Sequence, residues 1–503
     1  MAHVYAGLGH DGRKIFLYAA DRKTKVRQVL WGDWLSLDGE EPDGWLRIKW
    51  SPNTNPQTLY VPKADTTPTR PLEIVFLDVG QGDGAVLITP ETGEKEGVIV
   101  VDAGEGDNME RFLNGRFKAY RGFSFDSAVI THPDSDHYLG FGAIFANPKI
   151  GFKRIWQNGL VERAVSGTWA KLGAFVKDPA SKLTYQTELA QTEADVRAQL
   201  PDRKANARYG FPGVMQAALD NPKVGEIGML STEHGQIEDG RSYMPGYAPS
   251  DGRGYAIEVL GPAVERDADG KARLRRIGGS YGETKNGHSI LLRLTYGRFS
   301  VFFGGDLNEP AERYLLTRYA GLSAFPAAGG TEYRMMVGKV AQRFRSDIMK
   351  VCHHGSEKVT DAFLEAVNPA CFIISSGDEE GHVHPRPDLL GRLGRAGRGA
   401  SPVLLSTELQ RSTREKTDQA LIEKVGKAVA QLAAAPSPAL AETIKADLAK
   451  LSKTNVDVYG AIYLKTDGQR LITAFKIEAS SPTDLWFYYE YVFTPGGELV
   501  LVT

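Results

Sequence analysis

The most constraining feature of the sequence is a short segment in which four imidazole or carboxylate side chains fall within six residues. It reads Thr-His-Pro-Asp-Ser-Asp-His over residues 131–137 and follows an apolar, strand-like stretch ending at Ile130. Burying several charged groups beside a strand is costly unless they are paired or bind a cation. On an irregular loop such groups can converge from several directions. The segment therefore predicts a metal-binding loop at the end of a buried strand.

Two further segments have the same design of an apolar strand that delivers polar groups to a sheet edge. Residues 301–303 are apolar and are followed by Gly-Gly and Asp306, a carboxylate that can bridge two cations with one oxygen on each. Residues 348–351 are followed by His353 and His354, and His384 comes about thirty residues later. Because adjacent histidines point to different sides, one is expected to bind metal. The other can act as a general acid or hydrogen-bond to a phosphate oxygen.

The order of strand-like and helical segments predicts an α/β protein with mixed sheets. Residues 1–65 hold about five short strands and suggest a small barrel resembling bacterial SH3-like domains. Residues 72–410 carry the polar motifs, and within them 147–283 are less regular and are interpreted as an insertion or lid. Residues 411–503 predict two amphipathic helices and a β-hairpin turning at Asp467-Gly468, which can complete the main sheet system.

The predicted helices share apolar faces, as the spacing of their aliphatic residues shows. The two sets are Leu421, Val425, Val429 and Leu432 in the first helix, and Leu440, Ile444, Leu448 and Leu451 in the second.

Composition excludes few functions. The 503 residues have a formal net charge of -2, which neither requires nor excludes a nucleic-acid partner, since a local basic groove can exist in a neutral chain. The two cysteines, Cys352 and Cys371, lie in apolar segments and are expected to be buried free thiols. No run of about 20 apolar residues is present, and the N-terminus lacks a secretory pattern. A cytoplasmic protein that does not insert into membranes is expected.

The motifs, taken in order, resemble the metallo-β-lactamase superfamily and, within it, the hydrolase domain of the ComEC family of competence DNA-uptake proteins. The matching pieces span roughly residues 72–390. They are Phe76-Leu77-Asp78-Val79-Gly80-Gln81-Gly82-Asp83, Val101-Asp102-Ala103-Gly104, residues 131–137, Asn286-Gly287-His288-Ser289, Gly305-Asp306, His353-His354-Gly355-Ser356 and His384-Pro385. The resemblance implies an αββα sandwich with the metal site along one edge.

By position, the resemblance implies a site for two divalent cations. One cation would be held by His132, Asp134 and His354, and the other by Asp136, His137 and His384, with Asp306 between them. Asp134 stands where many superfamily members have histidine. A carboxylate there favours Mn²⁺ or Mg²⁺ relative to Zn²⁺, although Zn²⁺ stays a candidate.

Other polar residues near these motifs are expected to have supporting roles. Asp78, Asp83 and Asp102 belong to the resemblance and are expected to orient the ligands through hydrogen bonds. His288 lies near the place of a further ligand in zinc-binding relatives, but it is not expected to bind metal, and His234 and His382 are interpreted as loop residues.

The resulting hypothesis is metal-dependent hydrolysis of a phosphodiester, with DNA or RNA as substrate and Asp136 and His353 as catalytic residues. A small-molecule phosphoesterase acting on a nucleotide or phosphorylcholine-like group is the first alternative. Acyl or lactam hydrolysis and a scaffold without turnover are the others. The N-terminal barrel is expected either to recruit a protein partner or to be a packing appendage without a ligand.

Overall fold

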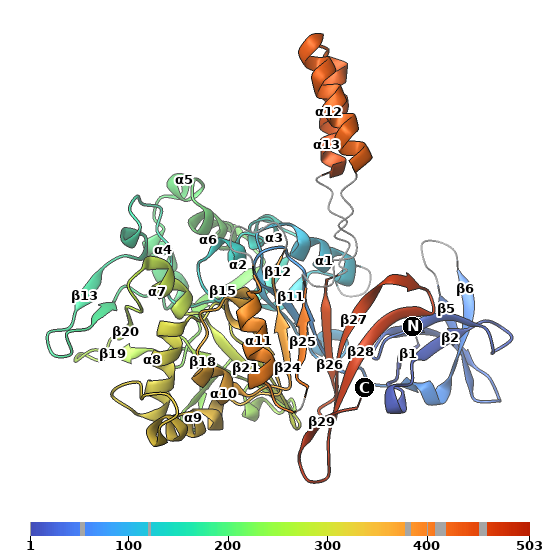
Figure 1. Cartoon of the computed structure of the whole chain (residues 1–503), viewed down its shortest axis with the longest axis horizontal. Helices are drawn as coiled ribbons and strands as arrows, with labels where there is room; N and C mark the ends of the chain where they lie inside the picture. Colours follow the sequence, from blue (N-terminus) through green and yellow to red (C-terminus); the bar gives the residue numbers. More distant parts are fainter. Residues whose placement is uncertain are drawn as a thin grey trace.

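Two large β-sheets pack face to face and carry helices on both outer faces (Figure 1). The computed structural model describes residues 2–50, 56–118, 122–377, 384–399, 401–407, 419–451 and 460–502. The interpretation of His382 therefore lies outside the described residues. The layer order helix, sheet, sheet, helix is the arrangement expected from the sequence.

The first sheet has ten strands and contains a parallel half and an antiparallel half. In spatial order the strands are β15 (Val224–Met229), β12 (Gly151–Gln157), β11 (Ser124–Val129), β10 (Val98–Ala103), β9 (Gly84–Ile88), β8 (Leu72–Phe76), β26 (Ile462–Thr466), β27 (Arg470–Ser481), β28 (Asp484–Phe493) and β29 (Leu499–Leu501). Because β10, β11, β12 and β15 run parallel, the loops after them emerge at one edge.

The second sheet has eight strands, of which the last four are parallel. In spatial order they are β16 (Gln236–Glu238), β17 (Arg241–Tyr243), β18 (Tyr255–Gly261), β21 (Leu291–Tyr296), β22 (Phe299–Phe303), β23 (Ile348–Lys350), β24 (Cys371–Ile374) and β25 (Val403–Ser406).

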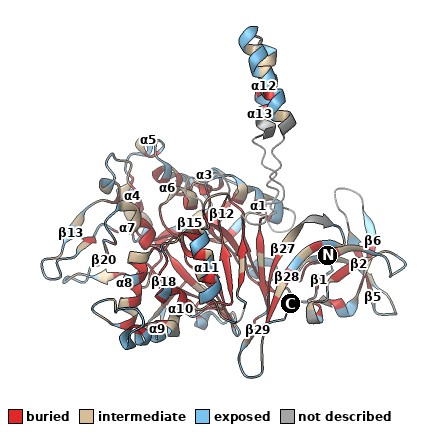
Figure 2. Ribbon diagram, viewed as in Figure 1, coloured by how far each residue is buried: buried red, intermediate tan, exposed pale blue. Residues whose placement is uncertain are grey.

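The core between the sheets is apolar and forms because side chains of both inner faces interdigitate. Phe76 of β8 and Phe303 of β22 stack at its centre, with ring centroids 5.8 Å apart. Helices cover the outer faces, and Figure 2 shows their inward sides buried. On the ten-stranded sheet lie α1 (Asn108–Phe117), α2 (Ser135–Tyr138), α3 (Phe141–Ala146) and α6 (Gly210–Asp220). On the eight-stranded sheet lie α8 (Glu309–Ala320), α9 (Thr331–Phe344), α10 (Asp361–Val367) and α11 (Pro387–Ala396).

The N-terminal residues form a seven-stranded antiparallel sheet with its own small core. Its order is β3 (Lys25–Val29), β2 (Ile15–Tyr18), β6 (Gln57–Pro62), β5 (Trp45–Trp50), β4 (Trp34–Glu40), β1 (His3–Ala6) and β7 (Thr66–Thr67). The SH3-like barrel stays a prediction. The sheet packs against the C-terminal strands, where the Gln28 Oε1 accepts hydrogen bonds from the backbone of Leu485 and Trp486.

Residues 147–283, interpreted from the sequence as an insertion or lid, contribute strands to both large sheets. This region supplies β12 and β15 to the first sheet and β16, β17 and β18 to the second. A separate four-stranded sheet lies at the end of the molecule opposite the N-terminal sheet (Figure 1). Its strands are β13 (Phe175–Lys177), β14 (Thr184–Gln186), β20 (Ala272–Arg275) and β19 (Glu265–Arg266). The helices α4 (Glu193–Gln199), α5 (Arg203–Asn206) and α7 (Tyr281–Gly287) lie in or beside this region.

The C-terminal segment has two parts. The hairpin β26–β27 forms as predicted, and β26 pairs with β8, so the C-terminal strands extend the first sheet. Helices α12 (Gln419–Ala434) and α13 (Pro438–Leu451) pack on each other and stand away from the sandwich (Figure 1). Val425 and Ile444 are buried between them, whereas Val429 and Leu448 stay 49% and 47% exposed. The predicted apolar stripes are thus only partly covered. Among the described residues, no helix has the length and apolarity needed to cross a lipid bilayer.

Candidate metal centre

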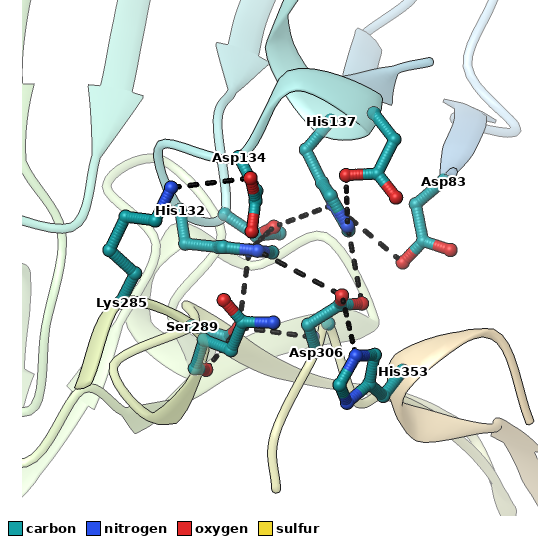
Figure 3. Close-up of polar contacts among 12 residues, drawn as sticks. Asp83, His132, Asp134, His137, Lys285, Ser289, Asp306 and His353 are labelled. Atoms are coloured by element: carbon teal, nitrogen blue, oxygen red, sulfur yellow. Dashed lines mark hydrogen bonds and ion pairs between the residues drawn. The ribbon is translucent and has the colours of Figure 1, made fainter. Parts of the chain in front are cut away.

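The polar residues of the predicted site meet where strands of both sheets end. The loop after β11 leads through His132 and Asp134 into α2, which carries Asp136 and His137. Asp306 follows β22, and His353 and His354 form a short turn after β23. Parallel strands bring their carboxyl ends to one edge of a sheet, so three motifs that are distant in sequence meet there (Figure 3).

Glycines make this close approach possible. Gly305 has a φ of +48°, and a Cβ at this position would lie 2.7 Å from the Cβ of Ser289. Gly82 has a φ of +111°, and a Cβ there would lie 1.8 Å from the carbonyl oxygen of Asp136. Both positions therefore need glycine for the left-handed backbone and for the contact. They bring the loops of Asp83 and Asp306 against the His/Asp-rich loop.

Asp306 is the centre of the cluster, because each of its carboxylate oxygens faces two imidazoles. Oδ1 lies 3.2 Å from the Nε2 atoms of both His137 and His354. Oδ2 lies 3.9 Å from the Nε2 atoms of His132 and His353. Four imidazole nitrogens thus surround one buried carboxylate, which is 2% exposed.

Asp136 adds a carboxylate to one side of this cluster. Its Oδ2 lies 3.3 Å from the Nε2 of His354, and its Oδ1 lies 3.9 Å from the Nε2 of His137. The amide of Gln81 donates to the same Oδ2. Asp136 therefore belongs with His137 and His354.

This grouping differs from the one carried over by position. His354 lies beside Asp136 and His137, whereas the resemblance placed it with His132 and Asp134. The reason is the backbone of the short turn: His353 and His354 have φ values of +50° and +52°. This sparsely populated left-handed conformation directs the two rings to different sides.

His384, expected to accompany Asp136 and His137, lines the same cleft as Asp136. Its ring centroid is 6.0 Å from that of His353. It lines the cleft together with His353 and eight other residues. The full set is Gln81, Glu105, Asp134, Ser135, Asp136, Asn286, Asp306, His353, His354 and His384, around an open space of about 690 Å³.

Asp134 is tied to neighbouring side chains as well as facing the cleft. Its Oδ1 accepts a hydrogen bond from the backbone of Ser135 and so caps α2. The ammonium of Lys285, a buried residue, lies 3.2 Å from the same oxygen and 3.2 Å from Glu162 (Figure 3). The sequence gives no local sign of Lys285, because it lies on α7, 151 residues from Asp134.

In three of the imidazoles, the ring nitrogen that does not face Asp306 lies within hydrogen-bonding distance of another group. Nδ1 of His137 lies 2.8 Å from Asp102, and Nδ1 of His354 lies 3.1 Å from the carbonyl oxygen of Ser375. The hydroxyls of Thr131 and Ser289 lie 3.1 and 3.3 Å from Nδ1 of His132. Such partners orient ring nitrogens toward a metal. The contact of Asp102 with His137 is the one that the predicted orienting role requires, and the role itself stays a prediction.

Asp83 is expected to orient the ligands, and it also lies close enough to the cluster to offer a ligand atom. Asp83, His137, Asp306 and His354 each offer one potential ligand atom, and these four atoms lie within 4.8 Å of one another. Asp83 also pairs with the ammonium of Lys350, which is buried and contacts the carbonyl oxygen of Gly305. Lys350 thus links the loop of Asp83 to the loop of Gly305.

The pKa values of the cluster residues are set by burial and by the charges of their neighbours. Burial alone would lower the pKa of His137 and His354, but the carboxylates, with Asp306 foremost, raise both well above the ordinary value. Burial would raise the pKa of Asp306, yet the imidazoles beside it hold it well below the usual range. Burial lowers the pKa of His132 far below its usual value. Without a cation the carboxylates are therefore ionised and the imidazoles of His137 and His354 protonated, so a cation would bind by displacing those protons.

Two other histidines and the two cysteines have no part in this cluster. The Nε2 of His288 faces the carbonyl oxygen of Arg275 at 2.7 Å, and burial lowers its pKa to about 4. His234 contacts Ser231 and Gln191 in a loop. Cys352 and Cys371 are buried free thiols, as predicted.

The donor set fits divalent cations. Nε2 of His132 and Oδ1 of Asp306 are buried and have no hydrogen bond among the described residues, although both face the cluster. Buried polar atoms are normally satisfied, so atoms that converge without hydrogen bonds are what metal ligands would show. A mixture of imidazoles and carboxylates suits Zn²⁺ or Mn²⁺.

Comparisons with known proteins give little further information. No family model and no curated protein sequence matches the chain. A metallo-β-lactamase from Hirschia baltica aligns with 13% identity over 66% of this chain and 96% of its own, with a TM-score of 0.23. A mutant of the CmlA β-hydroxylase aligns with 11% identity over 80% of this chain and 78% of its own, with a TM-score of 0.30. At such TM-scores neither similarity supports a conclusion about this chain, so conclusions about the site rest on its own geometry.

Proposed function

We propose that this chain is a metallo-β-lactamase-fold hydrolase that cleaves phosphoesters with two divalent cations, and that its preferred substrates are phosphodiesters such as DNA or RNA. One observation carries the proposal: each oxygen of Asp306 faces a different pair of imidazoles, at 3.2 Å on one side and 3.9 Å on the other. A carboxylate so placed suits a bridge between two cations. The motifs in the sequence support the phosphodiester preference.

The residues divide into two sets in this proposal. Asp136, His137 and His354 would hold one cation, and His132 and Asp134 would hold the other, with Asp306 shared. Cations held by these residues would lower the pKa of a bound water molecule and polarise a phosphoryl oxygen. Asp102 keeps His137 in the orientation in which Nε2 faces Asp306.

His353 would act on the substrate rather than on the cations. Its side chain is 26% exposed and lines the cleft, unlike that of His354, which is 1% exposed. Burial lowers the pKa of His353 from its ordinary value, opposed by Asp306. A ring at this wall would hydrogen-bond to a phosphoryl oxygen or give a proton to the leaving oxygen.

The decisive experiment is hydrolysis of labelled single- and double-stranded DNA with Mn²⁺ or Zn²⁺, compared with bis-p-nitrophenyl phosphate and nitrocefin. The proposal expects DNA and bis-p-nitrophenyl phosphate to be cleaved and nitrocefin to be left intact. Asp136→Ala should abolish cleavage, while Asp220→Ala on the exposed end of α6 should not. Cleavage that survives Asp136→Ala would contradict the proposal, and hydrolysis of nitrocefin alone would favour acyl chemistry.

A small-molecule phosphoester is the second candidate substrate, and one observation favours it. No lysine or arginine is among the ten described residues that line the cleft, so the lining offers a long polyanion neither of the two side chains that are always cationic. A long polyanion usually contacts several basic side chains. Faster turnover of a nucleotide or p-nitrophenyl phosphorylcholine than of DNA would select this candidate.

The non-catalytic alternative makes a different prediction. A scaffold that had lost turnover would hold no stoichiometric metal by elemental analysis, whereas the proposal expects up to two ions per chain. We further propose that the protein acts in the cytoplasm and that the N-terminal sheet recruits a protein partner. On that sheet Trp34 is 50% exposed and stacks on His3.

A further inference from the structure

An arginine and a tryptophan stack on each other at the outer end of the molecule, beyond the cleft. Trp169 lies in a short helical turn (Trp169–Leu172), and Arg276 directly follows β20. The Arg276 guanidinium carbon lies 4.2 Å from the ring centroid of Trp169. Trp169 is half-buried, and Arg276 is exposed. The pair therefore presents a flat, cationic surface to solvent.

A continuous line of contacts joins this pair to the wall of the metal cleft. The ring of Trp169 lies 5.7 Å from that of Tyr281, edge to face. The ammonium of Lys285 lies 5.0 Å from the ring of Tyr281 and 3.2 Å from Asp134, which lines the cleft (Figure 3). The stacked pair is thus joined to the cleft wall through Tyr281 and Lys285.

Arg276 differs from the neighbouring arginines of the same segment in the partners of its guanidinium group. Arg273 pairs with Asp178 at 2.9 Å, and Arg275 pairs with Glu265 at 2.9 Å. Arg276 has no carboxylate partner among the residues that the structure describes, and its guanidinium donates to the carbonyl oxygen of Gly279. Its positive charge is therefore available to an anion from outside the protein.

We propose that Trp169 and Arg276 form a subsite for one nucleotide of a single-stranded nucleic acid whose scissile phosphate lies at the metal centre. This rests on the proposed phosphodiesterase function and narrows its substrate class. A base would stack on the flat surface of the pair while Arg276 contacts the adjacent phosphate. A duplex hides the faces of its bases, so only an unpaired strand can use both interactions. The subsite also supplies the basic contact that the lining of the cleft lacks.

The test compares a substrate that reaches the subsite with one that does not. Arg276→Ala is the main variant, because Arg276 is exposed and its guanidinium contacts Trp169 and the carbonyl oxygen of Gly279, neither of which lines the cleft. We expect kcat/KM for a fluorescein-labelled twelve-nucleotide single strand to fall about ten-fold. The kcat/KM for bis-p-nitrophenyl phosphate, which has no base and only one phosphate, should change less than two-fold. Arg203→Ala, an exposed arginine on α5, is the matched control.

A second pair of variants separates stacking from folding. Trp169→Ala should reduce oligonucleotide turnover by a similar factor, and Trp169→Phe should restore much of it, because a smaller aromatic face can still stack. Thermal unfolding should show each variant folded. Trp34→Ala, which removes an exposed tryptophan from the N-terminal sheet, should leave both substrates unaffected.

The outcomes are distinguishable. Equal losses on both substrates, no loss on the oligonucleotide, or equal sensitivity of duplex and single-strand cleavage to Arg276→Ala would each overturn the subsite and leave the phosphodiesterase proposal standing. Wild-type protein that hydrolyses neither substrate with Mn²⁺ or Zn²⁺ would contradict the phosphodiesterase proposal, and the subsite would fall with it.

Discussion

The Nδ1 atom of His137 and the Oδ2 atom of Asp102 lie 2.8 Å apart in a pair without solvent exposure. The carboxylate contacts the ring nitrogen opposite to the one that faces Asp306, and it would make the imidazole a stronger ligand for a cation. We expect Asp102→Asn to weaken metal affinity by roughly 10–100-fold. Competition with a chromophoric chelator would measure this, with Asp220→Asn as control. Unchanged affinity would show that Asp102 serves only the loop of Thr131, to which it also hydrogen-bonds.

Replacing the central carboxylate should affect both cations at once. Asp306→Asn keeps the shape of the side chain but removes the charge that two oxygens share between four imidazoles. We expect bound metal to fall by at least one ion per chain and phosphodiester turnover to fall on the order of 100-fold or more. Elemental analysis and hydrolysis of bis-p-nitrophenyl phosphate would measure these effects. Full metal content in the variant would exclude Asp306 as a bridge.

His353→Ala should separate chemistry from metal binding. If the ring contacts the substrate, kcat should fall about 10²–10⁴-fold while the metal content stays at the wild-type value. His354→Ala is the matched comparison, since its Nε2 faces both Asp136 and Asp306, and it should lose metal. Loss of metal in both variants would make His353 a ligand.

Removing the cations should destabilise the protein. Without them, several carboxylates and imidazoles remain crowded around Asp306 in a buried space. Free metal at one hundred times its Kd stabilises a folded state by about 2.7 kcal/mol. We therefore expect EDTA to lower the Tm and Mn²⁺ or Zn²⁺ to restore it, as seen by differential scanning fluorimetry. The Asp306→Asn variant should show a smaller response.

Glu312, which is not one of the proposed ligands, should make the stability of the protein depend on pH. It is fully buried on α8, and burial raises its pKa to about 8, although the backbone N–H of Thr360 donates to it. A folded pKa above the ordinary 4.5 means that folding favours the protonated form. Its contribution is therefore fully present below about pH 4.5 and is lost as the pH rises toward 8.

Glu312→Gln should remove this dependence because the amide stays neutral and can still accept from Thr360. The stability of the variant relative to wild type should rise between pH 5 and pH 8, by a few kcal/mol at most. Urea unfolding at both pH values would measure the difference. A difference that does not change with pH would show that Glu312 keeps its charge in the folded protein.

Local sequence patterns predicted most of the strands and the loops that carry the site. Apolar runs such as residues 299–303 and 348–350 are strands in the structure, because a strand buried on both faces needs apolar residues throughout. In residues 147–283 the sequence pattern is less regular. Their core strands, such as β12 and β15, alternate with irregular segments, and pairing partners far apart in sequence decide whether such strands join a sheet.

The sequence by itself determined which residue types could bind cations and that strands would deliver them to a sheet edge, because both depend on local order and side-chain chemistry. Only the tertiary structure decided their neighbours. It placed His354 beside Asp136 through a left-handed turn, joined Lys285 to Asp134, and put Lys350 beneath Asp83. Such contacts depend on how two sheets and their connecting loops pack, and no local pattern records the distance between residues more than a hundred positions apart.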